Sequence, residues 1–136
     1  VPPETQAYLD GRADAPEIVP IGSPAAEAFP AEEDAILGAD AYEVSANVAA
    51  AFFDGPSAIG VATGANFADA LTGGSVVGRP DVGPGPVLLT AADALPGSVV
   101  DYITSISDGV GRVLVFGGDA AIQASVEEEI QAILGS

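Results

Sequence analysis

The stretch Ala58–Gly78 reads AIGVATGANFADALTGGSVVG and combines a strand with the helix that follows it. Its first part, Ala58–Thr63, is a short apolar run with β-branched residues between a Pro and a Gly, which is typical of a buried strand. The second part, Asn66–Gly78, predicts a helix with Asn66 as its N-cap and Asp69 in its first turn. A glycine pair in the middle of this helix weakens it and indicates close packing or an early end.

The alternation of strands and helices continues to the end of the chain. Two further apolar runs, Pro86–Thr90 and Arg112–Gly118, predict buried strands. Helices are expected from Leu95–Pro96 to about Ile106, and from a capping box of Ser125 and Glu128 to Leu134. Apolar strands that alternate with helices indicate a parallel sheet with helices on both faces. We therefore predict a small doubly wound α/β fold.

A further helix is predicted ahead of the first strand. Asp40 and Glu43 form a start that resembles a capping box. The apolar residues that follow are spaced as one face of a helix, and they are Val44, Val48, Ala51 and Phe52.

The composition excludes much chemistry. The 136 residues carry a formal charge of −17, with no His, Cys, Met, Trp or Lys and three Arg. Without these side chains there is no Ser-His-Asp triad, Cys or His zinc site, or P-loop lysine. A strongly acidic chain without a basic stripe repels nucleic acid. The longest uncharged run, Gly55–Ala68, is too short to cross a membrane. We expect no nucleic-acid partner, membrane insertion or resident cofactor.

The acidity itself has two general explanations. It can keep an Ala-rich domain dispersed, or it can be an adaptation to high salt. Hydrophobic residues make up 49% of the chain, which indicates a folded domain despite the charge. The chain does not start with Met, so we expect a processed or excised product.

The beginning of the chain echoes its end. Val1–Leu9 matches Leu95–Ile103, and IGSPAA at Ile21–Ala26 matches FGGDAA at Phe116–Ala121. We interpret residues 1–34 as the C-terminal part of a preceding repeat and residues 35–136 as one complete repeat. Units of this kind bury shared faces against neighbours.

A series of motifs resembles the cell-wall-binding repeat type 2 family of bacterial surface proteins. The matching segments are Ala35–Val44, Gly64–Leu71, Pro86–Thr90, Ala94–Pro96 and Phe116–Ile122. The resemblance implies a Rossmann- or flavodoxin-like unit, usually found as three tandem repeats that pack as a pseudo-trimer. It also implies a role outside the cell, anchoring secreted proteins without covalent bonds to anionic polymers of the cell wall.

The chain departs from the family pattern at three positions. The two family Arg positions are Ala35 and Ala41, and the family Thr is Val44. If those cations contact an anionic polymer, this copy has lost the contact. With a charge of −17, the domain is expected to need bridging Ca²⁺ or Mg²⁺ to hold such a polymer.

Candidate ligand-binding residues follow the ends of the predicted strands. In a doubly wound sheet these loops share the crevice at the carboxyl edge, which is the usual ligand position. The candidates are Asn66, Asp69, Thr90, Gly117 and Gly118. The alternative is structural: Asn66 and Asp69 hold their own helix start, Gly117–Gly118 forms a tight turn, and Asp119 caps the next helix.

Other family motif positions are Gly38, Asp40, Tyr42, Leu88 and Leu89. The family links the apolar Val87–Leu89 stretch to polymer attachment, although an apolar strand is more often core. Tyr42 and Phe67 could stack on sugars, but aromatic residues at helix starts usually close the core. Glu127–Glu129 is best explained as the acidic first turn of a helix rather than as a metal site.

Two hypotheses remain for the function. The first is a non-catalytic anchoring module of the cell surface, which binds a cell-wall glycopolymer. The second is a structural subunit of a surface layer or filament, in which residues 1–34 complete a neighbouring copy and head-to-tail contacts give a trimer or a filament. No pair of carboxylates stands out as a glycosidase site, so we do not expect an enzyme.

Overall fold

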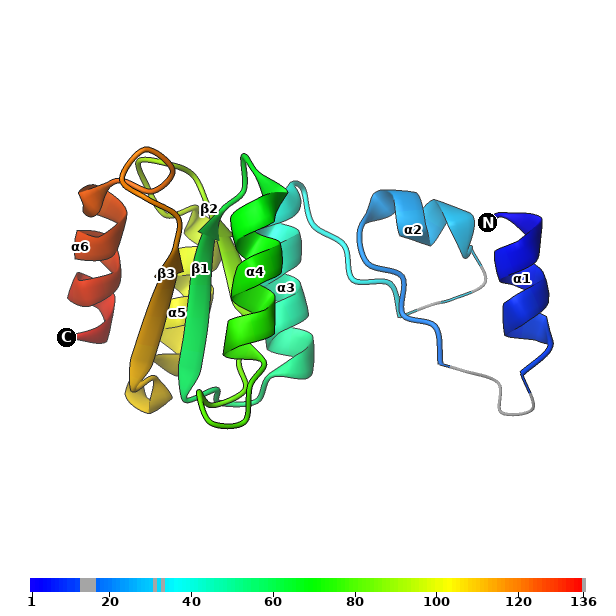
Figure 1. The fold of residues 1–136 in the computed structure, drawn as a ribbon, viewed down its shortest axis with the longest axis horizontal. Helices are drawn as coiled ribbons and strands as arrows, with labels where there is room; N and C mark the ends of the chain where they lie inside the picture. The colour runs from blue at the N-terminus through cyan, green and yellow to red at the C-terminus, as the bar shows by residue number, and fades with distance from the viewer. Residues whose placement is uncertain (13–16, 31, 33, 136) are drawn as a thin grey trace.

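The computed structural model describes residues 1–136 apart from residues 13–16, 31, 33 and 136 (Figure 1). Parts of both predicted repeats therefore lie outside the described residues. The elements are, in chain order, α1 (Pro3–Asp10), α2 (Ser23–Ala28), α3 (Ala41–Phe52), β1 (Ala58–Thr63), α4 (Phe67–Val77), β2 (Val87–Thr90), α5 (Gly97–Ile106), the 3₁₀ turn η1 (Ser107–Gly109), β3 (Arg112–Phe116) and α6 (Ala124–Leu134).

The three strands form one parallel sheet in the order β2-β1-β3. In this sheet Val61 of β1 pairs with Leu88 on one side and with Val115 on the other. All six residues of β1 are buried, which agrees with their continuous apolar sequence. The prediction of a parallel α/β sheet is confirmed, whereas the doubly wound Rossmann- or flavodoxin-like assignment stays a prediction for a sheet of three strands.

Helices cover the sheet on both sides (Figure 1). Helix α4 lies against one face, where the ring of Phe116 from β3 is packed next to Gly73. The other face carries the main core with residues from α3, α5 and α6. This core consists of Ala46, Ala49, Ile59, Val61, Leu88, Leu95, Val99, Tyr102, Ile103, Ile122, Val126 and Ile130.

Two of the predicted helix starts are confirmed. Asp40 accepts a hydrogen bond from the N–H of Glu43, and the Glu43 carboxylate accepts one from the N–H of Ala39. Asn66 caps α4 by accepting a bond from the N–H of Ala68. Each cap satisfies donors that a helix start leaves unpaired.

The predicted capping box of α6 is wrong. The N-cap lies two residues before Ser125, at Gln123, and no side chain caps the helix. The Ser125 hydroxyl instead donates to the carbonyl of Asp93, because the loop after β2 lies beside this end of α6. The same loop explains why Glu129, rather than Glu128, makes a bond there: its carboxylate accepts the N–H of Leu95.

The apolar face predicted for α3 is also corrected. The residues that enter the core are Ala46 and Ala49, not Val44 and Val48, which are only half-buried. Phe52 is 56% exposed. Helix α3 is apolar on more than one side, so the spacing of its large residues does not identify the side that the sheet covers.

The first two helices stand apart from the rest of the fold (Figure 1). Neither α1 nor α2 has a buried residue, and within the described residues neither contacts another helix or strand. The segment is joined to the remainder by a parallel bridge between Ile21 and Ile36. The N–H of Ile36 donates to the Pro20 carbonyl at 2.8 Å, and the N–H of Gly22 donates to the Ile36 carbonyl at 2.8 Å.

Candidate functional site

The loops at the carboxyl ends of the strands gather two of the predicted ligand residues. Gly117, directly after β3, has a positive φ of 130°, which favours glycine. A Cβ placed on Gly117 would lie 3.3 Å from Oδ2 of Asp69, so the loop after β3 and the start of α4 are in contact. The structure therefore brings Asp69 and Gly117 together, at the edge of the sheet where they were expected.

The other residues of this edge are engaged in local structure. Asn66 caps α4, and the Thr90 hydroxyl lies 3.0 Å from the Ala91 carbonyl and 3.2 Å from that of Ala94. The Gly118 carbonyl accepts the N–H groups of Ala121 and Ile122 in a tight turn. These contacts match the structural alternative for this edge, and their role in binding stays a prediction.

Asp119 does not cap α6 as predicted. The helix begins four residues further along the chain, after Gln123, because residues 118–122 form a turn first. None of the three pockets described below is lined by the predicted ligand residues of the carboxyl edge.

Three of the family motif positions shape the start of α3. A Cβ on Gly38 would lie 2.7 Å from the N atom of Val44, so a side chain there would collide with the helix. Asp40 is the N-cap of the helix. The Tyr42 ring packs over Gly64, where an added Cβ would lie 2.5 Å from the ring. The motif thus fixes α3 against the end of β1.

Leu88 and Leu89 have different surroundings. Leu88 is fully buried in the core, as expected for an apolar strand. Leu89 is half-buried, and its N–H donates to the Ser45 hydroxyl at 3.0 Å. This bond ties β2, an edge strand, to α3.

A groove of about 840 Å³ lies beside β2, between α3 and α4. Its lining is largely apolar and includes two positions where the family pattern differs from this chain, Ala41 and Val44. The sequence pattern placed Val44 and Val48 on one apolar face of a helix but did not identify the groove that this face lines. The signal that could have found it is the apolar sequence of α3 on more than one side. Two other pockets, of about 430 and 320 Å³, lie between β3 and α6 and between α3 and α5.

An exposed apolar patch lies on α4. Phe67 is 80% exposed and Leu71 is 73% exposed, and the two are one helical turn apart on the same side of the helix. The expectation that Phe67 closes the core is wrong, because the sheet contacts the side of α4 that carries Gly73 and Val77. For Tyr42, which packs against the core, the same expectation is confirmed.

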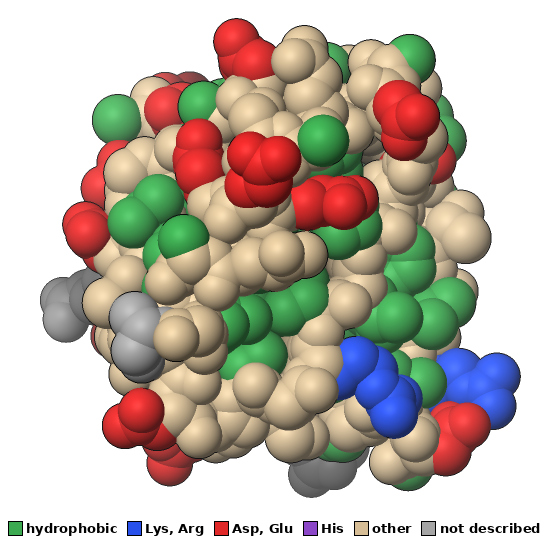
Figure 2. All heavy atoms as spheres, turned by 90° about the vertical axis from the view of Figure 1, so that its left-hand side faces the viewer, with side chains coloured by type: hydrophobic (Ala, Val, Ile, Leu, Met, Phe, Trp, Pro, Cys, Tyr) green, Lys and Arg blue, Asp and Glu red, His purple; other side chains and the backbone are tan. Residues whose placement is uncertain are grey.

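Acidic side chains are spread over the face shown in Figure 2, whereas the Arg side chains gather at one edge. Arg79 forms an ion pair with Asp81 at 2.9 Å, and this hydrogen-bonded guanidinium lowers the pKa of Asp81. No group of three acidic residues within the described part of the chain is close enough to hold a metal ion. Of Glu127–Glu129, Glu127 lies in the first turn of α6.

The described helices were also compared with the length that a bilayer requires. None of them is both long and apolar enough to span a membrane.

Two comparisons with known proteins give a match for this chain. The model of the cell wall binding domain 2 (CWB2) family matches residues 35–127. The solved structure of Cwp6 from Clostridium difficile is similar, with a TM-score of 0.64 and 21% sequence identity. The match covers 74% of this chain and 15% of that one, so it concerns the fold alone. No curated protein matches the chain. Because the family model spans more than half of the sequence, the chain belongs to the cell wall binding domain 2 family.

Proposed function

We propose that this domain is a non-catalytic module that holds a protein to glycopolymers of a bacterial cell wall. The observation that carries the proposal is the family match over residues 35–127, which covers β1, β2, β3 and the helices between them. The module would act outside the cell, at the cell surface. It would hold the polymer through non-covalent contacts. No cluster of catalytic side chains stands out among the described residues.

The patch of Phe67 and Leu71 on α4 is the best candidate for the contact with sugars. Contiguous exposed apolar patches mark interaction sites, and Phe67 and Leu71 form such a patch on one side of α4. An aromatic ring can pack its face against the apolar side of a sugar ring, and Phe67 stands at the exposed start of its helix. Asp69, in the same first turn, is two residues from Phe67 and points to another side of the helix, towards Gly117.

Charge sets the conditions for binding. The chain carries −17, and the family Arg positions Ala35 and Ala41 offer no cation to an anionic polymer. Repulsion between like charges opposes the encounter at low ionic strength. We therefore propose that Ca²⁺ or Mg²⁺ bridges carboxylates of the domain to acidic groups of the polymer. Oxygen ligands of this kind suit both cations.

A sedimentation assay with purified Gram-positive cell walls tests this function. We expect the domain to be retained with CaCl₂ or MgCl₂ and released in NaCl of equal ionic strength. Phe67→Ala should weaken retention, whereas Phe52→Ala, which removes an exposed ring from α3 instead, should not. Absence of retention in every buffer would sink the proposal. Equal effects of the two substitutions would remove Phe67 from it.

A second candidate function is self-assembly into a surface layer or filament. It is favoured by the N-terminal segment, in which α1 and α2 have no buried residue. Helices of this length are marginal by themselves and gain stability mainly from packing against a partner. Sizing of the protein over a range of concentrations tests this candidate, and a monodisperse monomer at the highest concentration would count against it.

A further inference from the structure

Among the described residues, strand β3 has one neighbour in the sheet and one open edge. The N–H of Gly60 in β1 donates to the carbonyl of Pro86, so the main chain of Gly60 is directed at β2. Main-chain groups of successive residues in a strand point to opposite sides. The main-chain N–H and C=O groups of Ile59 and Val61 in β1 are therefore directed at β3.

The register shows which groups of β3 remain open. Ile59 pairs with Val113, and Val61 pairs with Val115. In a parallel ladder, a bonded residue exchanges hydrogen bonds with the two residues that flank its partner. The even-numbered residues of β3 thus bind β1, and the N–H and C=O groups of Val113 and Val115 point away from the sheet. An unpaired edge of this kind is a template for another strand.

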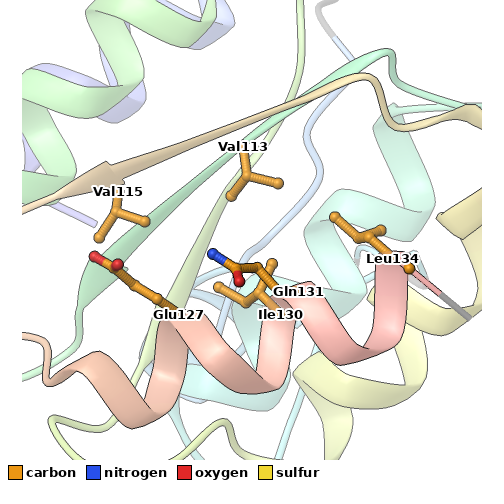
Figure 3. Close-up of a pocket in the computed structure, with 7 residues that line it drawn as sticks. Val113, Val115, Glu127, Ile130, Gln131 and Leu134 are labelled. Atoms are coloured by element: carbon orange, nitrogen blue, oxygen red, sulfur yellow. The ribbon is translucent and has the colours of Figure 1, made fainter.

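A groove of about 430 Å³ follows this edge on the side of α6 (Figure 3). Val113 and Val115 point from β3 towards α6, which lies beyond the open edge (Figures 1 and 3). Ile130 and Leu134 of α6 line the opposite side of the groove. The lining is apolar apart from Glu127 and Gln131 of α6, and the space lies where a fourth strand would add to the sheet.

The N-terminal segment repeats the local structure around β3. Helix α1 and helix α5 each begin after a proline N-cap, with φ and ψ of −57° and 142° at Pro2 and of −61° and 144° at Pro96. A glycine with positive φ follows in both segments, Gly22 at 81° and Gly117 at 130°. These glycines are 117 − 22 = 95 residues apart in the sequence.

The offset of 95 residues also relates the open edge of β3 to an edge that is covered in the N-terminal segment. Pro20 corresponds to Val115 and Gly22 to Gly117, and both residues of the first segment bond the main chain of Ile36. The bonded groups are those that, in β3, point away from β1. The segment around Ile36 thus occupies the position that is empty beside β3.

We propose that the open edge of β3 binds the Ala35–Leu37 segment of a second copy of this chain as a parallel fourth strand. The carbonyl of Val115 would accept the N–H of Ile36, and the N–H of Gly117 would donate to the Ile36 carbonyl. The second copy releases its own bridge to Ile21 and gains an equivalent pair of bonds. In addition, its added strand contacts the groove between β3 and α6.

The release is favoured by the weak attachment of the N-terminal segment, whose helices bury no residue. Since each copy offers one β3 edge and one Ile36 segment, the contact is head-to-tail and repeats along an assembly. The inference rests on the self-assembly proposed above as the second function, and it is independent of wall binding.

Amide NMR on the full chain tests the contact, together with sedimentation equilibrium of the same samples. As the concentration rises, the N–H group of Gly117 should shift and exchange with solvent about tenfold more slowly, and that of Val115, whose carbonyl is bonded in the contact, should shift. Because both copies are strongly acidic, association should strengthen in high NaCl. Sedimentation reports association of any kind, whereas the amides report the contact at β3.

Two variants on α6 provide a matched pair. Gln131→Glu adds a second carboxylate, in addition to that of Glu127, inside the groove, and Ala132→Glu adds the same charge next to it but outside the lining. We expect Gln131→Glu to weaken association several-fold more than Ala132→Glu. Equal weakening by both variants would remove the groove from the contact.

A mixing experiment tests the donor segment. Unlabelled Ile36→Pro, which lacks the donating N–H, should leave the Gly117 amide of labelled wild type unprotected, whereas unlabelled wild type should protect it. Three outcomes would overturn the inference. They are concentration-independent exchange at Gly117, association that leaves the Val115 and Gly117 amides unchanged, and equal protection by Ile36→Pro.

Discussion

Two neighbouring glycines of α4 allow a direct test of how this helix packs on the sheet. An alanine at position 73 would place its Cβ 2.6 Å from Cδ2 of Phe116, closer than such contacts are found. The ring has little room to withdraw, because an added Cβ on Gly60 would also lie 2.9 Å from it. At Gly74 the added Cβ meets nothing within 4 Å.

The two substitutions share one effect and differ in the other. Alanine is favoured over glycine in a helix interior by about 0.8–1.0 kcal/mol. Overpacking of a well-filled interior costs about 1–3 kcal/mol. We therefore expect Gly74→Ala to raise the free energy of unfolding by about 1 kcal/mol. Gly73→Ala should lower it by about 0–2 kcal/mol, so the two variants should differ by about 1–3 kcal/mol.

Urea unfolding followed by far-ultraviolet circular dichroism measures this difference, since the chain has no Trp. The slopes of the transitions should agree, so that the midpoints report stability. Phe116→Leu replaces the ring by a smaller side chain. In this background Gly73→Ala should lower the free energy of unfolding by less than it does alone. The packing argument fails if Gly73→Ala is as stable as Gly74→Ala, or if its cost is unchanged in the Phe116→Leu background.

Three further substitutions test single interactions. The Tyr102 hydroxyl is buried without a partner in the described structure, and burial raises its pKa. Above pH 10 the unfolded chain therefore loses a proton that the folded chain keeps, and the free energy of unfolding falls. Tyr102→Phe should not lower stability at neutral pH and should reduce this alkaline loss, as pH-dependent urea unfolding would show. Asp40→Ala should cost about 1 kcal/mol through the lost cap of α3, measured by thermal unfolding. Ser45→Ala should cost about 1–3 kcal/mol by leaving the Leu89 N–H unpaired, with faster exchange of that amide.

Much of the fold could be predicted because each strand is recognisable from its own local sequence. Ala58–Thr63 is continuously apolar, and the structure buries every residue of it. The caps at Asp40 and Asn66 could be predicted because a single side chain makes each of them, with a donor two or three residues away. Such signals do not depend on distant parts of the chain.

The errors concern interactions between segments that are far apart in the sequence. Ser125 looks like a helix cap until the loop after β2 places the Asp93 carbonyl beside it. Similarly, Val44 and Ala46 are equally plausible core residues until the sheet covers one side of α3. Phe67 is exposed because a glycine, rather than an aromatic residue, permits the close approach of α4 to Phe116.

The candidate site was predictable in position but not in character. The carboxyl edge was correctly located, because Asp69 and Gly117 follow parallel strands and must therefore lie at the same end of the sheet. The groove beside β2 was not predicted, since its lining comes from α3, α4, the loop after α4, β2 and the Ile21–Gly22 segment together.

The outer position of α6 determines how the domain would respond to a pulling force. Beyond its core residues Val126 and Ile130, the end of the described chain is held mainly through α5, η1 and the loop at Asp93–Leu95. Strand β1, in contrast, is hydrogen-bonded on both sides. Tension applied at the C-terminal end would therefore peel α6 away before the central ladder is loaded in shear. Single-molecule pulling would record a short extension at low force, when α6 detaches, before the sheet unfolds at higher force.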